Sequence, residues 1–430
     1  CVFTPRNSKD VAAAIPILKQ SKTQFAVRGH GHMTVKGAAS INDGVLIALT
    51  KLNSLSISSD LKVASLTPGR SWLEVYNWIQ PYNRVIVGGR YAPVGVSGLL
   101  LGGGISYFGG QYGWAANNVI NYELVNGNGK IVNVNASSNS DLFWALKGGG
   151  SNFGIVTRFD VQTHSGGKVS AGTFEYGTST VEDALVATES WVSPGGGIDN
   201  GKLALSPIYY VDPVSGNRTA IVLGFDAENG RSLRNFSEGA VASTVKERAF
   251  ADFVAEGAAS GQALNIVSNA FHCTSFKASA ETVRLINTTV VPEVQKSLAK
   301  VPGAQIAFNM QPLSKGWFEA AKKAGGDAID LDPADGSIIV LNLYTRWSKA
   351  ADDDKVARWA KNVLQELQDK AKAVGLYYPF IYLNDAAAGE EPFPLYGKGK
   401  SLQKMKQIRK KYDPDGVFQD LMPGGFKLGK

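Results

Sequence analysis

The stretch Phe25-Ala26-Val27-Arg28-Gly29-His30-Gly31-His32 joins a short apolar strand to a glycine-rich loop. Glycine accepts positive φ and carries no Cβ, so the backbone N–H groups of such a loop can come close to an anion. Two of the four histidines of the chain lie in this loop, one residue apart. The stretch therefore predicts a ligand-binding loop at the end of a strand.

The length, the net charge and the absence of certain motifs exclude several classes of protein. The chain has 430 residues, enough for two domains with separate cores, and a net charge of +7. The lysine cluster at 404–411 is expected to be a solvated helix face, and no run resembles a nucleic-acid-binding segment. No apolar stretch reaches the length of a membrane-spanning helix, and the sequence shows neither metal-ligand spacing nor the GxGxxG of a Rossmann site. We therefore expect no nucleic acid, membrane span or metal ion.

The two cysteines and the glycosylation sequons bear on the compartment. In a secreted chain Cys1 and Cys273 could form a disulfide, whereas in a cytosolic chain Cys273 would be a small buried apolar residue. Four Asn-x-Ser/Thr sequons, about the number that chance gives, lie at Asn135, Asn217, Asn235 and Asn287. The residues themselves leave both compartments open.

Hydrophobic spacing predicts short elements in the first 165 residues. Val11, Ile15 and Leu18 recur at helical spacing, so we expect a helix over residues 9–20 that Ser8 caps. Asn126-Gly127-Asn128-Gly129 is a strong turn signal and predicts a hairpin of residues 119–125 and 130–136. Further strands are expected at 45–50, 61–69, 84–89 and 153–161, and further helices at 72–79 and 141–147.

From about Gly166 the pattern changes to longer strands and helices. Residues 203–211 and 220–225 are expected to be strands, and residues 279–298 and 351–374 helices, the first of them with a break at Pro292. These segments predict an α+β domain over an antiparallel sheet, followed by a basic closing helix in the tail at 402–418. We therefore predict two domains, one made of residues 1–165 and 386–430 and the other of residues 166–385.

Two further glycine-rich segments follow the first loop. Residues 91–113 carry no charge and contain Val94-Gly95-Val96-Ser97-Gly98 and, after three leucines, Gly102-Gly103-Gly104. Such a segment either brings its backbone close to a flat or anionic ligand or forms a turn-rich part of the core. The other segment is Trp144 to Thr157, with Gly148-Gly149-Gly150-Ser151-Asn152-Phe153-Gly154-Ile155-Val156.

In this order the three segments resemble the flavin-binding segments of the berberine bridge enzyme-like FAD-linked oxidases of the vanillyl-alcohol oxidase superfamily. Tyr382-Leu383-Asn384 is similar to the family's Tyr-x-Asn motif, and Tyr412-Asp413-Pro414 with Phe418 is similar to its closing signature. The resemblance covers the chain in order except for the middle domain. It implies a two-domain vanillyl-alcohol oxidase-type fold, with a bipartite PCMH-type FAD-binding domain and an antiparallel-sheet substrate domain.

The resemblance also implies how FAD is held. In the family the last histidine of the first loop bonds the flavin 8α-methyl group; this is His32 here, but His30 stands where glycine is usual, so the choice of ring stays open. Family members that bind FAD through two covalent bonds have a cysteine where this chain has Tyr91, so a single covalent bond to FAD is expected. The implied cofactor-binding residues are Arg28, Gly29, His30, Gly31, His32, Val94, Gly95, Ser97, Gly98, Gly102, Gly103, Gly104, Asn118, Gly150, Asn152, Gly154, Ile155, Val156 and Asn384.

Candidate catalytic residues lie near the C-terminus. The alternation of Phe380–Asn384 predicts a strand with Tyr382 and Asn384 on one face, and the resemblance puts that face on the substrate side of the flavin. Tyr382 is the favoured base if its pKa falls from about 10, and the alternative is a packed tyrosine bonded to backbone. Tyr344 is a second candidate. Many family members carry Tyr after the Asn, where this chain has Asp385.

The resemblance implies an FAD-dependent oxidase. Hydride would pass from a substrate C–H bond to flavin N5, and O2 would reoxidise the flavin and give H2O2. In the family a small residue at the position of Val94 leaves room for O2, although Val94 could also be a plain core residue. Sugar oxidases of the family tend to have both covalent bonds to FAD. Because Tyr91 replaces the second linking cysteine, a small secondary metabolite, such as an alkaloid or polyketide, is favoured over a carbohydrate as substrate. Alternatives are a non-redox cyclase or isomerase and a binding protein without turnover; a secreted monomer is expected.

Overall fold

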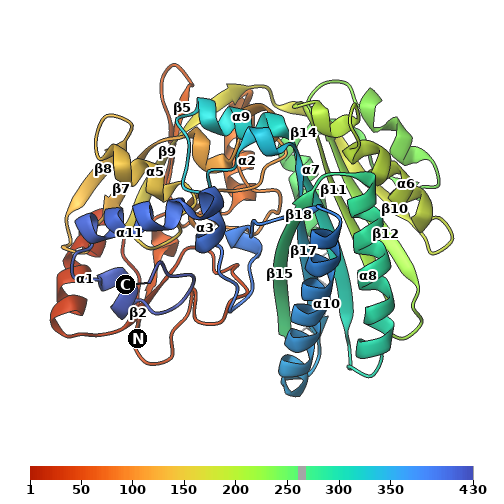
Figure 1. The fold of residues 1–430 in the computed structure, drawn as a ribbon. Coiled ribbons are helices and arrows are strands. Elements are labelled where there is room, and N and C mark those ends of the chain that lie inside the picture. Colours follow the sequence, from red (N-terminus) through yellow and green to blue (C-terminus); the bar gives the residue numbers. More distant parts are fainter. Residues whose placement is uncertain (260–267, 430) are drawn as a thin grey trace.

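The computed structural model describes residues 1–259 and 268–429. Two halves with separate β-sheets lie side by side, and both chain ends lie in the same half (Figure 1). That half contains the first 165 residues and the C-terminal helix, and the other contains the sheet with the most strands and the longest helices. The chain returns to the first half for its C-terminal helix, and part of the middle segment also packs there, since the ring of Trp317 lies edge-on against Trp114. The exact division at 165/166 and 385/386 stays a prediction.

The first half contains a small parallel sheet and a larger antiparallel one. The parallel sheet has the order β1-β3-β2, formed by β1 (Val2–Phe3), β3 (Val45–Ala48) and β2 (Phe25–Arg28). Six described strands form the antiparallel sheet, in which β6 also pairs with β9: β4 (Leu55–Ile57), β5 (Val63–Leu66), β9 (Ile155–Ser165), β7 (Val119–Val125), β8 (Ile131–Asn135) and β6 (Arg84–Ile86). The predicted hairpin is confirmed, because β7 and β8 pair across the Asn126–Gly129 turn.

Side-chain hydrogen bonds fix the start of α2 and the position of the C-terminal helix in the first half. The Ser71 side chain caps α2, and Glu74 bonds back to the Ser71 backbone in a capping box. The Tyr412 hydroxyl donates to Asp141 Oδ1 at 2.8 Å, which fixes the C-terminal helix α11 to α5. The described helices of this half are α1 (Ser8–Gln20), α2 (Trp72–Ile79), α3 (Val96–Leu101), α4 (Gly109–Tyr112), α5 (Ser140–Leu146) and α11 (Ser401–Tyr412).

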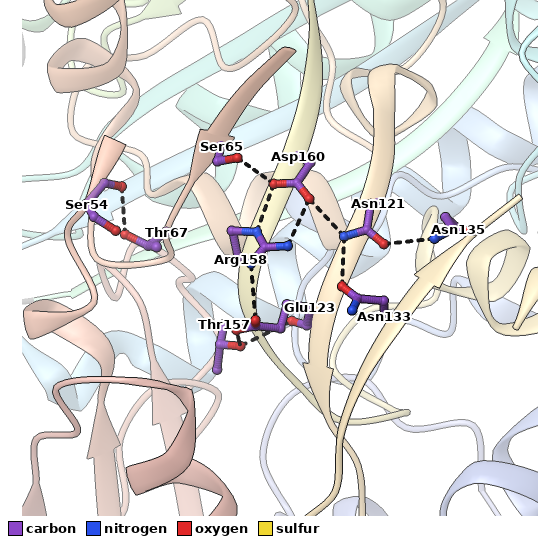
Figure 2. A network of polar contacts seen from close by, with 10 residues as sticks. All are labelled: Ser54, Ser65, Thr67, Asn121, Glu123, Asn133, Asn135, Thr157, Arg158 and Asp160. Carbon is purple, nitrogen blue, oxygen red and sulfur yellow. Dashed lines mark hydrogen bonds and ion pairs between the residues drawn. The ribbon is translucent and has the colours of Figure 1, made fainter. Parts of the chain in front are cut away.

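A polar network holds the strands of the antiparallel sheet in register (Figure 2). Arg158 on β9 donates from Nε to Asp160 Oδ1 at 2.8 Å and from Nη1 to Glu123 Oε2, on β7, at 3.1 Å. Asp160 also accepts from Ser65 on β5 at 2.6 Å and from Asn121 on β7 at 2.8 Å. Hydrogen bonds to charged groups contribute about 1.5–3 kcal/mol each. The network thus stabilises the frame on which the glycine-rich segments are mounted.

The second half is a large antiparallel sheet covered by helices on one face. Along its edge-to-edge order the described strands are β13 (Ala242–Ser243), β10 (Lys168–Tyr176), β12 (Arg218–Asp226), β11 (Leu203–Val211), β16 (Gln305–Leu313), β17 (Ile338–Trp347), β15 (Ser268–Lys277) and β18 (Tyr377–Tyr378), and β14 (Lys246–Ala249) pairs with β10. The helices on that face are α6 (Val181–Val192), α8 (Ala280–Leu298) and α10 (Asp353–Ala373), whereas α7 (Phe250–Ala259) contacts α2 and α9 (Lys315–Lys323) contacts α4 of the first half.

The two faces of this sheet have different tasks. Helices α6, α8 and α10 cover the outer face (Figure 1), where Leu341 and Leu343 of β17 are fully buried in a shared core. The alternate residues Asn342, Tyr344 and Arg346 point to the opposite face, toward the first half. Because side chains alternate along a strand, one strand supplies both the core and the inner face.

Several local predictions were wrong in detail. Asn7, and not Ser8, caps α1, because its side chain accepts from Asp10 N. Helix α8 continues through Pro292 without a break. The predicted strand Phe380–Asn384 is not formed; the nearest strand ends at Tyr378, and Leu383–Asp385 is a turn of 3₁₀-helix. In that turn Asn384 still reaches Tyr382, by a hydrogen bond instead of a shared strand face.

Other boundaries shifted as well. The expected strand 45–50 ends at Ala48, followed by a 3₁₀ turn, and the expected strand 61–69 shrinks to Val63–Leu66, since Leu61 has a φ of +58°. The two cysteines are not paired: Cys1 is exposed and Cys273 is buried.

Candidate active site

A cavity of about 1020 Å³ lies between the two halves. One wall, here the motif wall, consists of the lining residues of the segments 29–34, 94–99 and 150–156. The opposite wall, here the sheet wall, consists of the lining residues of β10, β11, β12, β15, β16 and β17. The predicted residues that line the cavity are Gly29, His30, Gly31, His32, Val94, Gly95, Ser97, Gly98, Gly150, Gly154, Ile155, Val156, Tyr344, Tyr382 and Asn384.

The first loop packs closely on the second glycine-rich segment. A Cβ on Gly29 would overlap Ser97 Oγ, and a Cβ on Gly95 would lie 2.7 Å from the His30 Cβ. Gly31 has a φ of +75°, a conformation that L side chains rarely adopt. These contacts explain why both segments need glycine, and they bring two distant stretches of sequence into one surface.

Two further glycines leave open space on the cavity side. A Cβ on Gly98, in α3, would have no atom within 4 Å, and one on Gly150 would have its nearest atom at 3.6 Å. Gly150 also has a φ of +65°. A wall without side chains lets a flat ring or a phosphate approach the backbone. The motif wall is therefore shaped for a large planar, anionic ligand.

The His32 ring faces the cavity beside Tyr91. The two ring centroids are 5.6 Å apart in an edge-on arrangement. The surrounding protein lowers the pKa of His32, first by desolvation and then by the nearby His30, even though the ring keeps accessible surface toward the cavity. A lowered pKa keeps the imidazole neutral near pH 7, and a neutral ring nitrogen is nucleophilic.

Tyr382 lies between the two walls, and its hydroxyl oxygen accepts two hydrogen bonds from the protein. The hydroxyl oxygen accepts from Ile105 N and from Asn384 Nδ2, each at 2.9 Å, and the ring stacks on Trp114 at 5.7 Å. Burial, and then the nearby Asp385, raise the pKa of Tyr382. Since both lone pairs are in use and the phenol stays protonated, Tyr382 is better suited to donate a hydrogen bond into the cavity than to act as base.

Tyr344 lies on β17, further along the sheet wall. The Arg346 Nε donates to its hydroxyl oxygen, and the guanidinium lies 4.7 Å from the ring centroid. Burial raises the pKa of Tyr344 despite this arginine. Neither predicted tyrosine base therefore has the lowered pKa that such a role requires.

A cluster of polar side chains that no sequence motif predicted lies at the sheet wall. It consists of Ser206, Asn309, Gln311 and Asn342 on the strands of this wall, together with Arg90 and Asp385 in the segments beside it. Gln311 Nε2 donates to Asp385 Oδ2 at 2.7 Å, and Arg90 donates to Gln311 Oε1. Burial raises the pKa of Asp385, while Gln311, Arg90 and Asn342 oppose this shift. A carboxyl group that lines a cavity and has a raised pKa is suited to proton transfer.

Comparison with known proteins identifies the family. A model described as an FAD binding domain matches residues 1–135. Over its whole length the chain is 39% identical to the FAD-dependent monooxygenase prx3 of Penicillium roqueforti, across 86% of that protein. The chain belongs to the family of FAD-dependent oxidoreductases that includes prx3. It is an FAD-dependent enzyme, as the resemblance implied.

Solved structures confirm the fold of this oxidoreductase. The structure of 6-hydroxy-D-nicotine oxidase from Arthrobacter nicotinovorans matches with a TM-score of 0.80 at 19% identity, over 97% of this chain and 90% of that one. A berberine bridge enzyme variant described as a reticuline dehydrogenase matches with a TM-score of 0.72 at 16% identity, over 100% and 89%. The predicted α+β fold of the vanillyl-alcohol oxidase type is thus confirmed.

The cavity of the oxidoreductase fits FAD. Its motif wall offers backbone free of side chains at Gly98 and Gly150, and a neutral imidazole at His32. Its volume of about 1020 Å³ is at the upper end of ligand pockets, which measure about 300–1,000 Å³. Among the described residues no group of His, Cys, Asp and Glu could hold a metal ion.

Six predicted cofactor residues lie outside the cavity lining: Arg28, Gly102, Gly103, Gly104, Asn118 and Asn152. A Cβ on Gly102 would overlap the Asn384 amide, so this glycine makes room for the Tyr-x-Asn turn. Asn118 donates to the carbonyls of Tyr112 and Trp114. Gly102 thus supports the wall from behind, and Asn118 fixes the backbone at Tyr112 and Trp114.

Asn152 has a similar supporting place. It is fully buried, its amide donates to the carbonyls of Gly149 and Phe426, and its carbonyl accepts from Gln419 Nε2. These bonds tie the C-terminal tail to the third glycine-rich segment. Asn152 thus fixes the shape of the motif wall without lining it.

Sequence reasoning missed Arg90, Gln311 and Asn342. Each is a single polar residue with apolar neighbours along the chain, and no spacing connects them. Asp385 gave a signal, because it departs from the family's pattern after Tyr-x-Asn. That departure could have marked it as a candidate acid or base.

Proposed function

We propose that the enzyme oxidises a small organic substrate and passes the electrons to O2 with formation of H2O2. FAD, when bound, supplies the hydride acceptor and the site of reoxidation. The observation that carries this proposal is that one continuous cavity joins the motif wall to a sheet wall lined with polar side chains. A substrate on the sheet wall would therefore face the cofactor on the motif wall.

A single covalent link at His32 is part of the proposal. His32 lies on the cavity surface with a lowered pKa, and Tyr91 occupies the place from which a cysteine could form a second link. His30 lines the same cavity and is the alternative. A covalent histidyl link raises the potential of a bound flavin, which suits an oxidase.

The substrate we propose is a secondary metabolite, such as an alkaloid or polyketide. One fold relative acts, by its name, on 6-hydroxy-D-nicotine. The relative prx3 is named a monooxygenase, which makes oxygen insertion the second candidate. A carbohydrate stays the less favoured substrate because Tyr91 replaces the linking cysteine.

The test is a set of hydroxylated and aminated aromatic compounds added to the holoenzyme, first without and then with air. We expect anaerobic bleaching of the flavin, and peroxide after air is admitted. Product without bleaching or peroxide would indicate a cyclase or isomerase. Product that carries oxygen from labelled O2 would indicate a monooxygenase, and no change with any compound would favour a binding protein.

We also propose secretion and glycosylation, which the family resemblance favours. Among the sequons, Asn217 and Asn235 are exposed in the structure. Every helix in the described ranges is too short or too polar to cross a lipid bilayer. Treatment of the natural protein with a peptide N-glycosidase should lower its mass; an unchanged mass would contradict glycosylation. Light scattering should give the mass of a monomer.

A further inference from the structure

We propose that Arg346, at the open end of the sheet wall, binds a carboxylate group of the substrate. This inference rests on the proposed oxidase function and adds to it the chemical class of the substrate, an aromatic carboxylic acid in its ionised form. The aromatic part of that acid lies on the neighbouring row of the sheet, which contains Tyr210, Tyr344 and Phe271.

Strand register places Arg346 where the sheet wall reaches solvent. On β17 it lies directly opposite Gln305 of β16 and Asn269 of β15, and all three residues line the cavity. Gln305 and Asn269 are exposed, whereas Asn342, four residues away on β17, is buried. Four residues of a strand span about 13 Å. The wall therefore runs from a buried end at Asn342 to an open end at Arg346.

The Arg346 guanidinium has hydrogen-bond donors left for a ligand. Its Nε donates to the Tyr344 hydroxyl oxygen, and its central carbon lies 4.7 Å from the centroid of that ring, so the side chain is held over the wall. Within residues 1–259 and 268–429 its two Nη groups have no hydrogen-bond partner and no carboxylate forms an ion pair with it. Residues 260–267 contain neither Asp nor Glu.

An arginine in this condition fits one kind of ligand group. Arg346 keeps accessible surface and lines the cavity. The two Nη groups of a guanidinium lie in one plane and can donate two parallel hydrogen bonds to the oxygens of a carboxylate. A substrate with a carboxylate would supply the negative charge that the surrounding protein lacks.

The next row of the sheet offers an aromatic surface beside this cation. Tyr210 of β11, Ala307 of β16, Tyr344 of β17 and Phe271 of β15 are paired one to the next, and all four line the cavity. The Phe271 and Tyr344 rings pack edge-on, with centroids 5.1 Å apart. Residues two apart on one strand are separated by about 7 Å, so this row lies next to the Arg346 guanidinium. A flat ring that carries a carboxylate can contact both rows at once.

The motif wall approaches the same place. Tyr91 lies beside the His32 ring, with the centroids 5.6 Å apart. Burial raises the pKa values of Tyr210 and Tyr344; Arg346 opposes both shifts, and Tyr91 adds to both. Because such electrostatic effects weaken with distance, the three tyrosines and the guanidinium surround one part of the cavity. A ring bound there lies across from the proposed link to FAD.

The other charged groups of the cavity are less suited to this role or lie far from it. Arg90 donates to two side chains of the sheet wall. Glu256 forms an ion pair with Arg248. Glu175 lies on β10, four strands away from β17, which corresponds to about 19 Å. At physiological ionic strength charges are screened beyond about 8 Å, so Glu175 does not repel an anion at Arg346.

The test compares 2-naphthoate with 2-naphthamide, which has nearly the same shape without the charge. Binding of each to the oxidised holoenzyme is measured by calorimetry under argon. A hydrogen bond to a charged group corresponds to about tenfold to hundredfold in affinity, so we expect naphthoate to bind at least about tenfold more tightly. Arg346→Gln should abolish this preference, and Arg346→Lys, which keeps the charge without the planar fork, should keep part of it.

Two controls accompany these variants. Arg358→Gln removes the same charge from the exposed surface of α10, behind the sheet, and should keep the preference of the wild type. Acetate, which lacks the ring, should bind at least about tenfold more weakly than naphthoate, because burial of an aromatic ring contributes about as much as this difference requires. Circular dichroism and flavin content show that each variant is folded.

Equal affinity of the folded wild type for naphthoate and naphthamide, no binding of either, or an unchanged preference in Arg346→Gln would overturn the proposal. A loss of flavin from folded Arg346→Gln would also overturn it, because the cation would then serve the cofactor. Since the measurement needs no turnover, a preference without peroxide from any substrate would refute the oxidase function and leave the carboxylate site in place. Peroxide from neutral compounds, with equal binding of the two probes, would do the reverse.

Discussion

The two walls of the cavity are built on opposite plans. The motif wall presents backbone, through glycines such as Gly98 and Gly150 that leave space at their Cβ positions. The sheet wall presents side chains, among them Gln311 and Asn342, which come from neighbouring strands. A backbone surface recognises a ligand that never changes, whereas side chains on a regular sheet can be exchanged one at a time. The difference indicates that cofactor binding and substrate choice are separate in this fold.

The separation is also visible in the framework. The segments of the motif wall are held from behind by buried polar residues such as Asn152, and by the strand network around Arg158. The sheet wall is held by its regular ladder and by the apolar core under α8 and α10. Changes on one wall should therefore leave the other intact, and this can be tested.

The largest effect is expected when the motif wall receives a side chain. Gly98→Phe would fill the open space that faces the cavity and compete with FAD. A phenyl ring here would occupy the space of the cofactor itself, so FAD should neither bind nor be attached, and flavin retention should be lost. Flavin absorbance per protein and circular dichroism measure retention and folding.

Gly177→Phe is the matched control for this experiment. It lies beyond β10, and a Cβ there would have its nearest atom at 3.9 Å. It should retain FAD. Full flavin content in Gly98→Phe would show that the cofactor does not use this part of the wall.

The next effect concerns the pH dependence of stability that the buried carboxyl group of Glu390, behind the sheet wall, causes. Burial raises the pKa of Glu390 to about 7 from its usual 4.5. Between these values the folded protein keeps a proton that the unfolded chain has released, so raising the pH from 4.5 to 7 lowers stability, by on the order of 3 kcal/mol. Above pH 7 the loss is complete.

Urea unfolding at pH 5 and pH 8 measures this dependence. Glu390→Gln should remove that part of the slope, while Glu247→Gln, on the exposed surface, should keep it. An identical slope in wild type and Glu390→Gln would contradict the burial argument.

The smallest effect concerns access of O2 to the motif wall. Val94 lines the cavity, and Val94→Leu adds one methylene there. We expect reoxidation of the reduced flavin by O2 to slow by about tenfold, which is ~1.4 kcal/mol, while binding and reduction stay within about twofold. Stopped-flow mixing with aerated buffer measures this rate. Unchanged reoxidation would place the O2 path elsewhere.

The sequence predicts one wall much better than the other, for a physical reason. Gly29, Gly98 and Gly150 lie in contiguous motifs because a backbone surface needs consecutive residues. Gln311 and Asn342 become neighbours only through strand pairing, which no local pattern records. The turn at Leu383–Asp385 was missed because tertiary contacts of Tyr382 override the alternation of Phe380–Asn384.

The most direct test of the account is acid precipitation of the purified enzyme, followed by a measurement of flavin absorbance in pellet and supernatant. We predict that the flavin stays with the wild-type pellet and with that of His30→Ala, and that it appears in the supernatant of His32→Ala. This result would place FAD on the motif wall with its ring beside Tyr91. Flavin released from the wild type, or retained covalently by His32→Ala, would contradict the link, and a folded protein without flavin would contradict the whole arrangement.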